Sequence, residues 1–372
     1  MRPIGGRILE RRDLDRRSWL AGVAALALAQ PAHADRPASY PRSYARLEDQ
    51  ARREGRLLVY SSLDPQEMSE VLRVFRARYP QITVEYKYLA SRALYDGFLR
   101  ETAAGRGSAD LVFNSAMDLQ IKLVNDGYAQ AYASPEKPNM PARAVWKNEA
   151  YGVTAEPLVF AYNKKLVPAA DVPRSHDELE RLLRTKPATY RGKVISYDVE
   201  HSNAGFLFLT QDEQLSHDTW RLLKALGKTK PKFYVSGEEM VRRIGQGEHL
   251  IGYNLLSSHV LKGRALNPSI EVVFPSDYTL VLSRIAFISK EARHPAAAKI
   301  FLDFLLSRTA QEFLAHRYMT PVRTDLSAPL SRMDASSRRL INVSPGLIAN
   351  LDQMRQRRLI AEWRDAVYPA AR

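Results

Sequence analysis

The chain alternates between short apolar runs and segments whose apolar residues recur every three or four positions. The run Leu57–Tyr60 has the length and composition of a buried strand. Met68, Val71, Leu72 and Phe75 follow at positions i, i+3, i+4 and i+7, which places them on one face of a helix. This stretch therefore predicts a strand followed by an amphipathic helix.

The same succession continues through most of the chain. Helical segments are predicted to start at Ser91, at Ser115 and at Pro295, and Ser115 with Asp118 has the spacing of a capping box. Strands that alternate with helices predict an α/β fold built on mainly parallel, doubly wound sheets. The further runs predicted as strands are residues 82–86, 110–113, 158–163, 194–198, 250–254, 272–275 and 279–288.

Residues 1–34 resemble an export signal and are left out of the fold prediction. Arg16 and Arg17 precede an apolar run, residues 20–29, which is followed by Ala32-His33-Ala34. A basic segment, a short apolar segment and an Ala-x-Ala end are typical of a signal cleaved on export, and the paired arginines resemble a twin-arginine signal. Ten apolar residues are too few to span a bilayer. We expect cleavage after Ala34 and a periplasmic protein.

Cysteine content and charge narrow the function further. The chain has no Cys, which excludes thiol catalysis and zinc–thiolate sites. After removal of residues 1–34, 49 basic residues face 38 acidic ones, a net charge of +11. The basic residues are scattered over predicted helix faces, so we expect no nucleic-acid partner and only a preference for anionic ligands.

Polar turns follow four of the predicted strands, and each precedes a predicted helix. They are Ser61-Ser62, Asn114-Ser115, Ser202-Asn203 and the segment from Asn254 to Ser258. Free N–H groups and the helix dipole favour anions at such positions, and ligands of open α/β sheets lie beyond the carboxyl ends of the strands. The alternative is that Ser and Asn only cap these helices. Four such turns in one chain favour a ligand site.

Two segments carry a resemblance to a known family. Residues 151–166, with Tyr162-Asn163-Lys164, and residues 279–288, followed by residues 289–299, resemble the outgoing and return crossovers of type 2 periplasmic solute-binding proteins, the receptors of ABC importers. The resemblance implies two doubly wound lobes joined by two crossover strands, with lobe one from 35–157 plus 286–372 and lobe two from 158–285. It also implies a hinge that closes on a solute and an ABC permease as partner. A sensor histidine kinase is the alternative partner.

Leu58-Val59-Tyr60-Ser61-Ser62 places the resemblance near the receptors for ferric iron and for phosphorylated solutes. Ferric-binding relatives have adjacent tyrosines where this chain has Leu255-Leu256, and leucine cannot coordinate iron. We therefore expect a small anionic solute that carries phosphate or carboxylate, with iron as the alternative, and no metal, cofactor or second subunit. The candidate ligand-binding residues are Ser61, Ser62, Ser115, Glu156, Ser202, Asn203, Tyr253, Asn254 and Arg284.

Single residues leave alternatives open. Arg284 stands in an apolar strand, where it could bind the anionic group of the solute or pair with an acid such as Glu156. Tyr253 could stack on a ligand or only pack. His201 and His259 read as ordinary polar residues, because neither has a His partner at i+3 or i+4. No nucleophile elbow, P-loop or dinucleotide fingerprint is present, so we do not expect an enzyme.

Overall fold

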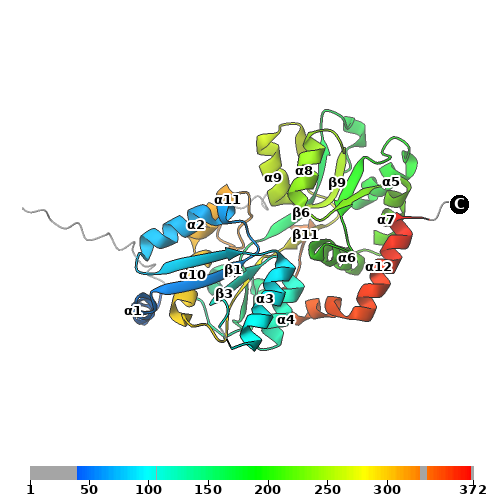
Figure 1. The fold of residues 1–372 in the computed structure, drawn as a ribbon. Coiled ribbons are helices and arrows are strands. Elements are labelled where there is room, and N and C mark those ends of the chain that lie inside the picture. Colours follow the sequence, from blue (N-terminus) through cyan, green and yellow to red (C-terminus); the bar gives the residue numbers. More distant parts are fainter. Residues whose placement is uncertain (1–39, 106, 327–332, 370–372) are drawn as a thin grey trace, which may run out of the picture. The chain divides into compact units, whose positions relative to one another are not determined.

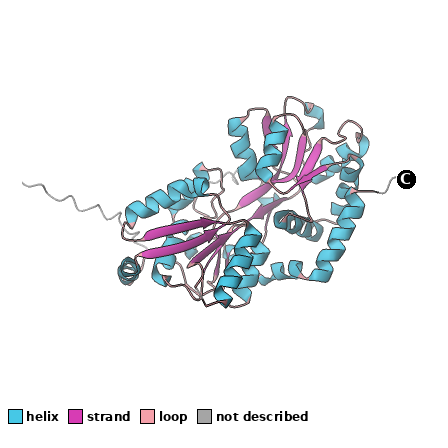
Figure 2. Ribbon diagram, in the orientation of Figure 1, coloured by secondary structure: helices cyan, strands magenta, loops and turns pink. Residues whose placement is uncertain are grey.

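The computed structural model describes residues 40–105, 107–326 and 333–369. The predicted export signal, residues 1–34, lies outside these ranges. Within them, no helix is both long and apolar enough to cross a membrane. The described residues contain two β-sheets, each flanked by helices (Figure 1, Figure 2).

The first sheet has six strands in the order β2-β1-β3-β12-β5-β4. Strands β1, β2 and β3 are parallel, whereas β12 runs antiparallel to β3 and β5. The strands are β1 (Arg56–Ser61), β2 (Thr83–Tyr88), β3 (Leu111–Asn114), β4 (Val145–Trp146), β5 (Ala150–Gly152) and β12 (Ile285–Ile288). The helices that belong with this sheet are α1 (Tyr44–Glu54), α2 (Pro65–Arg78), α3 (Ser91–Ala103), α4 (Met117–Asn125), α10 (Pro295–Leu306) and α11 (Arg308–His316).

The second sheet follows the order β13-β11-β6-β9-β7-β8, and β10 pairs with β6 outside this path. Its strands are β6 (Glu156–Asn163), β7 (Val194–Tyr197), β8 (Lys232–Tyr234), β9 (Ile251–Leu256), β10 (Ile270–Val273), β11 (Thr279–Leu282) and β13 (Arg338–Leu340). Its helices are α5 (His176–Thr185), α6 (Asn203–Leu215), α7 (Thr219–Lys228), α8 (Gly237–Gly245) and α9 (Ser257–Leu266). Short 3₁₀ turns are η1 (Lys137–Asn139), η2 (Ala142–Ala144), η3 (Ala169–Asp171), η5 (Ala335–Ser337) and η6 (Pro345–Leu351).

Helix α2 shows how the sequence pattern produces these elements. Its four apolar residues at helical spacing, Met68, Val71, Leu72 and Phe75, are all buried in the core against the first sheet, as predicted. Asp64 caps the helix by accepting a hydrogen bond from the N–H of the second helical residue, which satisfies one of the free donors of the first turn. The α/β class predicted from the sequence is confirmed.

The chain changes sheets twice, within a few residues each time. It leaves the first sheet after β5 and joins the second at β6, through residues 153–155. It returns between β11, which pairs with β6, and β12, which pairs with β3. The sequence predicted one continuous strand over residues 279–288. The structure has two strands, because Ser283 and Arg284 make the passage from one sheet to the other.

The C-terminal segment lies along elements of both sheets. Strand β13 pairs with β11 in the second sheet, and the turn η6 contacts α4 beside the first sheet. Helix α12 (Gln353–Val367) then packs against α7 (Figure 1, red). The lobe limits given above, 35–157 plus 286–372 and 158–285, stay a prediction, although β13 and α12 associate with the second sheet.

Candidate functional site

Three serine hydroxyls meet where adjacent parallel strands of the first sheet end. Ser62 follows β1, Ser91 follows β2, and Ser115 follows β3. The Oγ atom of Ser115 lies 3.4 Å from Oγ of Ser62 and 3.3 Å from Oγ of Ser91, and the Ser115 N–H donates to Ser62 Oγ at 3.0 Å. All three side chains are partly exposed. We refer to Ser62, Ser91 and Ser115 as the serine cluster.

Two helices begin at this cluster without a side-chain cap. The N-cap positions of α3 and α4 are Ala90 and Ala116, and neither provides a side-chain acceptor. The capping box predicted for Ser115 and Asp118 is not formed, because α4 begins only at Met117 and Asp118 accepts from the N–H of its neighbour Leu119. The first N–H groups of α3 therefore remain available to an anion, whereas in α4 the Asp118 carboxylate already accepts from the Leu119 N–H.

The remaining candidate in the first sheet, Ser61, is not part of the cluster. Its side chain is buried, and its Oγ accepts a hydrogen bond from the N–H of Leu63 at 3.0 Å. Ser61 therefore shapes the turn between β1 and α2. In the second sheet, Ser202 caps α6 through the N–H of Gly205 at 3.2 Å, and Asn203 is the first, partly exposed residue of that helix.

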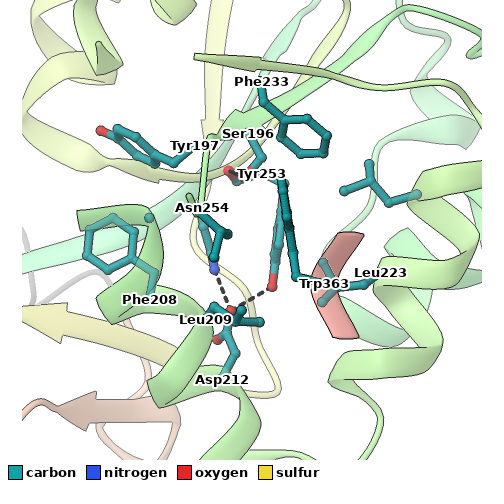
Figure 3. A pocket seen from close by; sticks show the side chains of 13 residues that line it. Ser196, Tyr197, Phe208, Leu209, Asp212, Leu223, Phe233, Tyr253, Asn254 and Trp363 are labelled. Carbon is teal, nitrogen blue, oxygen red and sulfur yellow. Dashed lines mark hydrogen bonds between the residues drawn. The ribbon is translucent and has the colours of Figure 1, made fainter. Parts of the chain in front are cut away.

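Tyr253 and Asn254 are hydrogen-bonded to a buried carboxylate (Figure 3). The Tyr253 hydroxyl donates to Asp212 at 2.7 Å, the Asn254 amide donates to the same oxygen, and the Tyr278 hydroxyl donates to the other oxygen at 3.0 Å. Asn254 adopts a left-handed backbone conformation, φ 57°, which Asn tolerates better than most residues. A role of Tyr253 and Asn254 in ligand binding stays a prediction. In this structure both side chains donate hydrogen bonds to Asp212.

The cavity in Figure 3 lies beside this carboxylate, between strands β7 and β9 and helices α6 and α7. It admits the centres of water-sized spheres over about 20 Å³, which is room for about one water molecule. Phe233, Leu223 and Trp363 close its apolar side. The cavity is too small for an organic solute. The candidate place for a solute is therefore at the polar turns that follow the strands.

At the two crossovers, Glu156 and Arg284 form a buried ion pair. Arg284 Nε donates to Glu156 at 2.7 Å and its Nη2 to the other carboxylate oxygen at 3.3 Å, with the two residues 6% and 0% exposed. Ser258 donates to the same carboxylate at 2.6 Å, and Thr154 accepts from the Arg284 N–H while donating to Glu156. Burial opposes the charge of Glu156, but Arg284 and the hydrogen bond from Ser258 hold its pKa below the ordinary value.

Around this pair, charged groups from both sheets lie close together. Lys262 of α9 is 2.8 Å from Glu238 of α8 and 3.7 Å from Glu67 of α2. The contact with Glu67 joins a helix of the second sheet to a helix of the first. Burial raises the pKa of Glu67, although Arg284 and Lys262 oppose this. Burial, with help from Arg284, lowers the pKa of His259 to about 4, so this imidazole is neutral at pH 7.

The sequence reasoning did not single out Ser91, Glu67 and Lys262, which the structure brings beside the candidate residues. Ser91 follows a strand end, as the chosen serines do, so the same rule would have found it. No sequence signal distinguishes Glu67 and Lys262 from other helix-face charges, because only the tertiary fold brings α2 and α9 together. Within the described ranges, no group of three or more His, Asp or Glu side chains could hold a metal ion.

Comparisons with solved structures show which class of protein this fold belongs to. The structure of the substrate-binding protein of an ABC transporter from Agrobacterium tumefaciens is 34% identical, covers 84% of this chain and 94% of its own, and has a TM-score of 0.78. Iron-bound HitA from Pseudomonas aeruginosa is 18% identical over 84% of this chain and 99% of its own, TM-score 0.68. Fructose-6-phosphate-bound AfuA from Actinobacillus pleuropneumoniae is 22% identical over 85% and 99%, TM-score 0.67.

The two sheets, the double crossover and these likenesses define a two-lobe solute-binding protein. The family described as bacterial extracellular solute-binding protein matches residues 108–343, and no curated protein sequence gives a match. The chain belongs to this family, which consists of binding proteins and not enzymes. It is a solute-binding component of an ABC transporter, as the resemblance of the crossovers implied.

Proposed function

We propose that this protein binds a small phosphorylated organic solute between its two lobes and delivers it to an ABC permease. The observation that carries the proposal is the serine cluster. Three hydroxyls and the starts of two helices whose N-cap residues provide no side-chain acceptor lie together at adjacent strand ends of the first sheet. Phosphate presents several acceptor oxygens and a double negative charge, which suits such a set of donors and the helix dipoles.

Two of the similar structures contain ligands of different kinds. AfuA was solved with fructose-6-phosphate bound, whereas HitA was solved with iron. In this chain, Leu255 and Leu256 occupy the end of β9 and are buried, so they provide none of the hard oxygen donors that ferric iron requires. Asp64 stands where ferric-binding relatives often have His, and it accepts the capping hydrogen bond of α2. We therefore favour the phosphorylated solute over iron.

Arg284 has a different part in this proposal. Because both of its bonded nitrogens point to Glu156, its charge is balanced within the protein, and we assign it to the hinge. In this proposal the phosphate is bound by Ser62, Ser91 and Ser115. Of the residues predicted to bind the ligand, Ser202 and Asn203 at the start of α6 could face the solute from the second lobe.

Hinge closure is the mechanism we propose for recognition. A solute that bridges the strand ends of both sheets binds the closed arrangement more tightly, and so shifts the equilibrium between the lobes towards it. We further propose that the protein acts as a monomer in the periplasm and that the permease binds its closed form. A sensor kinase could read the same form, and co-purification with a permease or a kinase would separate the two.

Thermal-shift and calorimetric screening of the purified protein tests the ligand. We expect sugar phosphates or other phosphorylated acids to raise the unfolding temperature, since a ligand that binds only the folded state stabilises it by mass action. Ser115→Ala should remove most of that response, whereas Ser69→Ala, an exposed serine on α2, should not. A tight response to Fe³⁺ with none to phosphorylated compounds would overturn the proposal.

A further inference from the structure

A second group of polar atoms lies at the strand ends of the other sheet. Tyr197 ends β7, Gly237 begins α8 after β8, and His259 lies in the first turn of α9 after β9. A Cβ atom on Gly237 would lie 2.3 Å from His259 Nδ1 and 2.4 Å from the Tyr197 hydroxyl. Only glycine at this position lets an imidazole nitrogen and a phenol oxygen approach the same stretch of backbone.

These two polar atoms have no partner of their own. His259 Nδ1 is buried without a hydrogen bond, and so is the hydroxyl of Ser257 in the same helix turn. Among the described residues, the Tyr197 hydroxyl also forms no hydrogen bond, and although its ring is buried in the core this oxygen retains some accessible surface. Buried polar groups are nearly always paired in folded proteins. The unpaired His259 Nδ1 and Ser257 hydroxyl, beside the charges of Arg284 and Glu156, therefore indicate a missing partner.

The charges around His259 limit what that partner can be. Arg284, Glu156, Glu238 and Lys262 are the charged groups that act on it. Arg284 is paired with Glu156 and Lys262 with Glu238, while His259 itself is neutral at pH 7. No unpaired positive charge is left beside His259, so a second carboxylate or phosphate on the solute would bind weakly there. A neutral group that donates and accepts hydrogen bonds fits.

We propose that His259 and Tyr197 bind the hydroxyl groups of the solute and make the site selective for polyhydroxylated phosphate esters. This inference rests on the proposed function. The serine cluster takes the phosphate, and the imidazole and phenol on the opposite lobe take the sugar or polyol end. The arrangement selects sugar and polyol phosphates against phosphoglycerates, which carry a second anion, and against alkylphosphonates, which lack hydroxyl groups.

Calorimetry with matched phosphorylated probes tests the inference. The probes are fructose-6-phosphate, glycerol-3-phosphate, 3-phosphoglycerate, methylphosphonate and inorganic phosphate. Tyr197→Phe removes one oxygen and keeps the buried ring, and His259→Leu removes the imidazole. Each should weaken binding of the sugar phosphate by about tenfold, the loss expected for one hydrogen bond to a buried group, and leave inorganic phosphate unaffected. His201→Leu, at an exposed histidine, is the control.

The outcomes separate this inference from the function it rests on. If Ser115→Ala abolishes binding of sugar phosphates while Tyr197→Phe and His259→Leu bind them as the wild type does, the phosphate site stands and the hydroxyl site is wrong. Equal affinity of the wild type for 3-phosphoglycerate and fructose-6-phosphate would also overturn the hydroxyl site. If the wild type responds to no phosphorylated compound, both proposals fail.

Discussion

Arg284 and Glu156 are each nearly inaccessible to water, and each is the main charge partner of the other. Removal of one partner from such a pair leaves an uncompensated charge in the interior. Arg284→Met should therefore lower the free energy of unfolding by about 3–5 kcal/mol, measured by urea denaturation. The double variant Arg284→Met/Glu156→Leu should recover much of this loss, since it buries no charge.

A different result would change the role of Arg284. If Arg284→Met is as stable as the wild type but binds phosphorylated solutes far more weakly, Arg284 contacts the solute and the pair with Glu156 opens on binding. The sequence alone left these two alternatives even. Arg284 makes two hydrogen bonds to the Glu156 carboxylate. This pairing depends on the two crossovers lying side by side, which the sequence does not show.

Asp118 provides a pH-dependent prediction at the same scale. It is 2% exposed, and burial raises its pKa from 3.8 to about 6. Between pH 4 and 6 the folded protein therefore holds a proton that the unfolded chain has released, so this residue makes the protein less stable as pH rises through that window. Asp118→Asn should be more stable than the wild type at pH 8, by roughly 3 kcal/mol at most, with little difference at pH 4.

Urea unfolding of both proteins at pH 4, 6 and 8 measures this difference. Asp126→Asn, a surface residue paired with Lys122, is the matched control and should show no such pH trend. An equal stability of Asp118→Asn and the wild type at every pH would mean that Asp118 stays solvated and charged.

At the scale of elements, hydrophobic periodicity predicted most strands and helices near their positions in the structure. It succeeded for α2 because four apolar residues at helical spacing leave little choice of face. It failed at residues 279–288, where apolar composition is continuous although Arg284 interrupts the strand to change sheets. Capping also misled at Ser115, because a serine after a strand can bond to neighbouring turns instead of its own helix.

The candidate site was also predictable only in part. The rule that solutes bind beyond strand ends located Ser62 and Ser115, and applied to Ser91 it would have completed the cluster. Tyr253 and Asn254 follow the same rule in sequence, yet they bond to Asp212, more than 40 residues away. Nothing local in the sequence shows such a partner, since it depends on how α6 packs under β9.

The packing of α12 on α7 depends on a glycine. A Cβ on Gly227 would lie 2.3 Å from the backbone oxygen of Ala366, and backbone cannot move aside as a flexible side chain does. Gly227→Ala should therefore displace α12 and lower the unfolding free energy by about 1–3 kcal/mol, the range for overpacking. Gly97→Ala in α3, where the nearest atom is 3.9 Å away at the end of an arginine, should be neutral or stabilising.

Circular dichroism melting of the two glycine variants compares them directly. The pair shares the same chemical change within a helix, so a difference between them reports contact with α12 and not helix propensity. If Gly227→Ala melts as the wild type does, α12 does not lie this close to α7 in solution.

At the scale of the whole molecule, the ion pair between Lys262 and Glu67, 3.7 Å apart, joins a helix of the second sheet to a helix of the first, and we expect hinge opening to break it. Lys262→Met should reduce the closed population and weaken solute binding, by about twofold to fivefold for a pair of this exposure. Small-angle scattering with and without a bound phosphorylated solute measures closure, and we expect a smaller radius of gyration with solute.

Arg264→Met is the control for this experiment, because Arg264 pairs with Glu271 on the second sheet alone. An unchanged radius of gyration in the presence of a confirmed ligand would contradict hinge closure. Equal affinity of Lys262→Met and the wild type would show that the contact between α2 and α9 adds nothing to the closed form.

The double crossover also sets the order in which the molecule can be assembled. Strand β12 lies in the interior of the first sheet, between β3 and β5, but it follows β3 by some 170 residues of chain. The whole second-sheet segment from β6 to β11 is made in between. During synthesis the first sheet therefore lacks a central strand until β6 to β11 have been made. Arg284 directly precedes β12, so its ion pair with Glu156 cannot form before that strand is made.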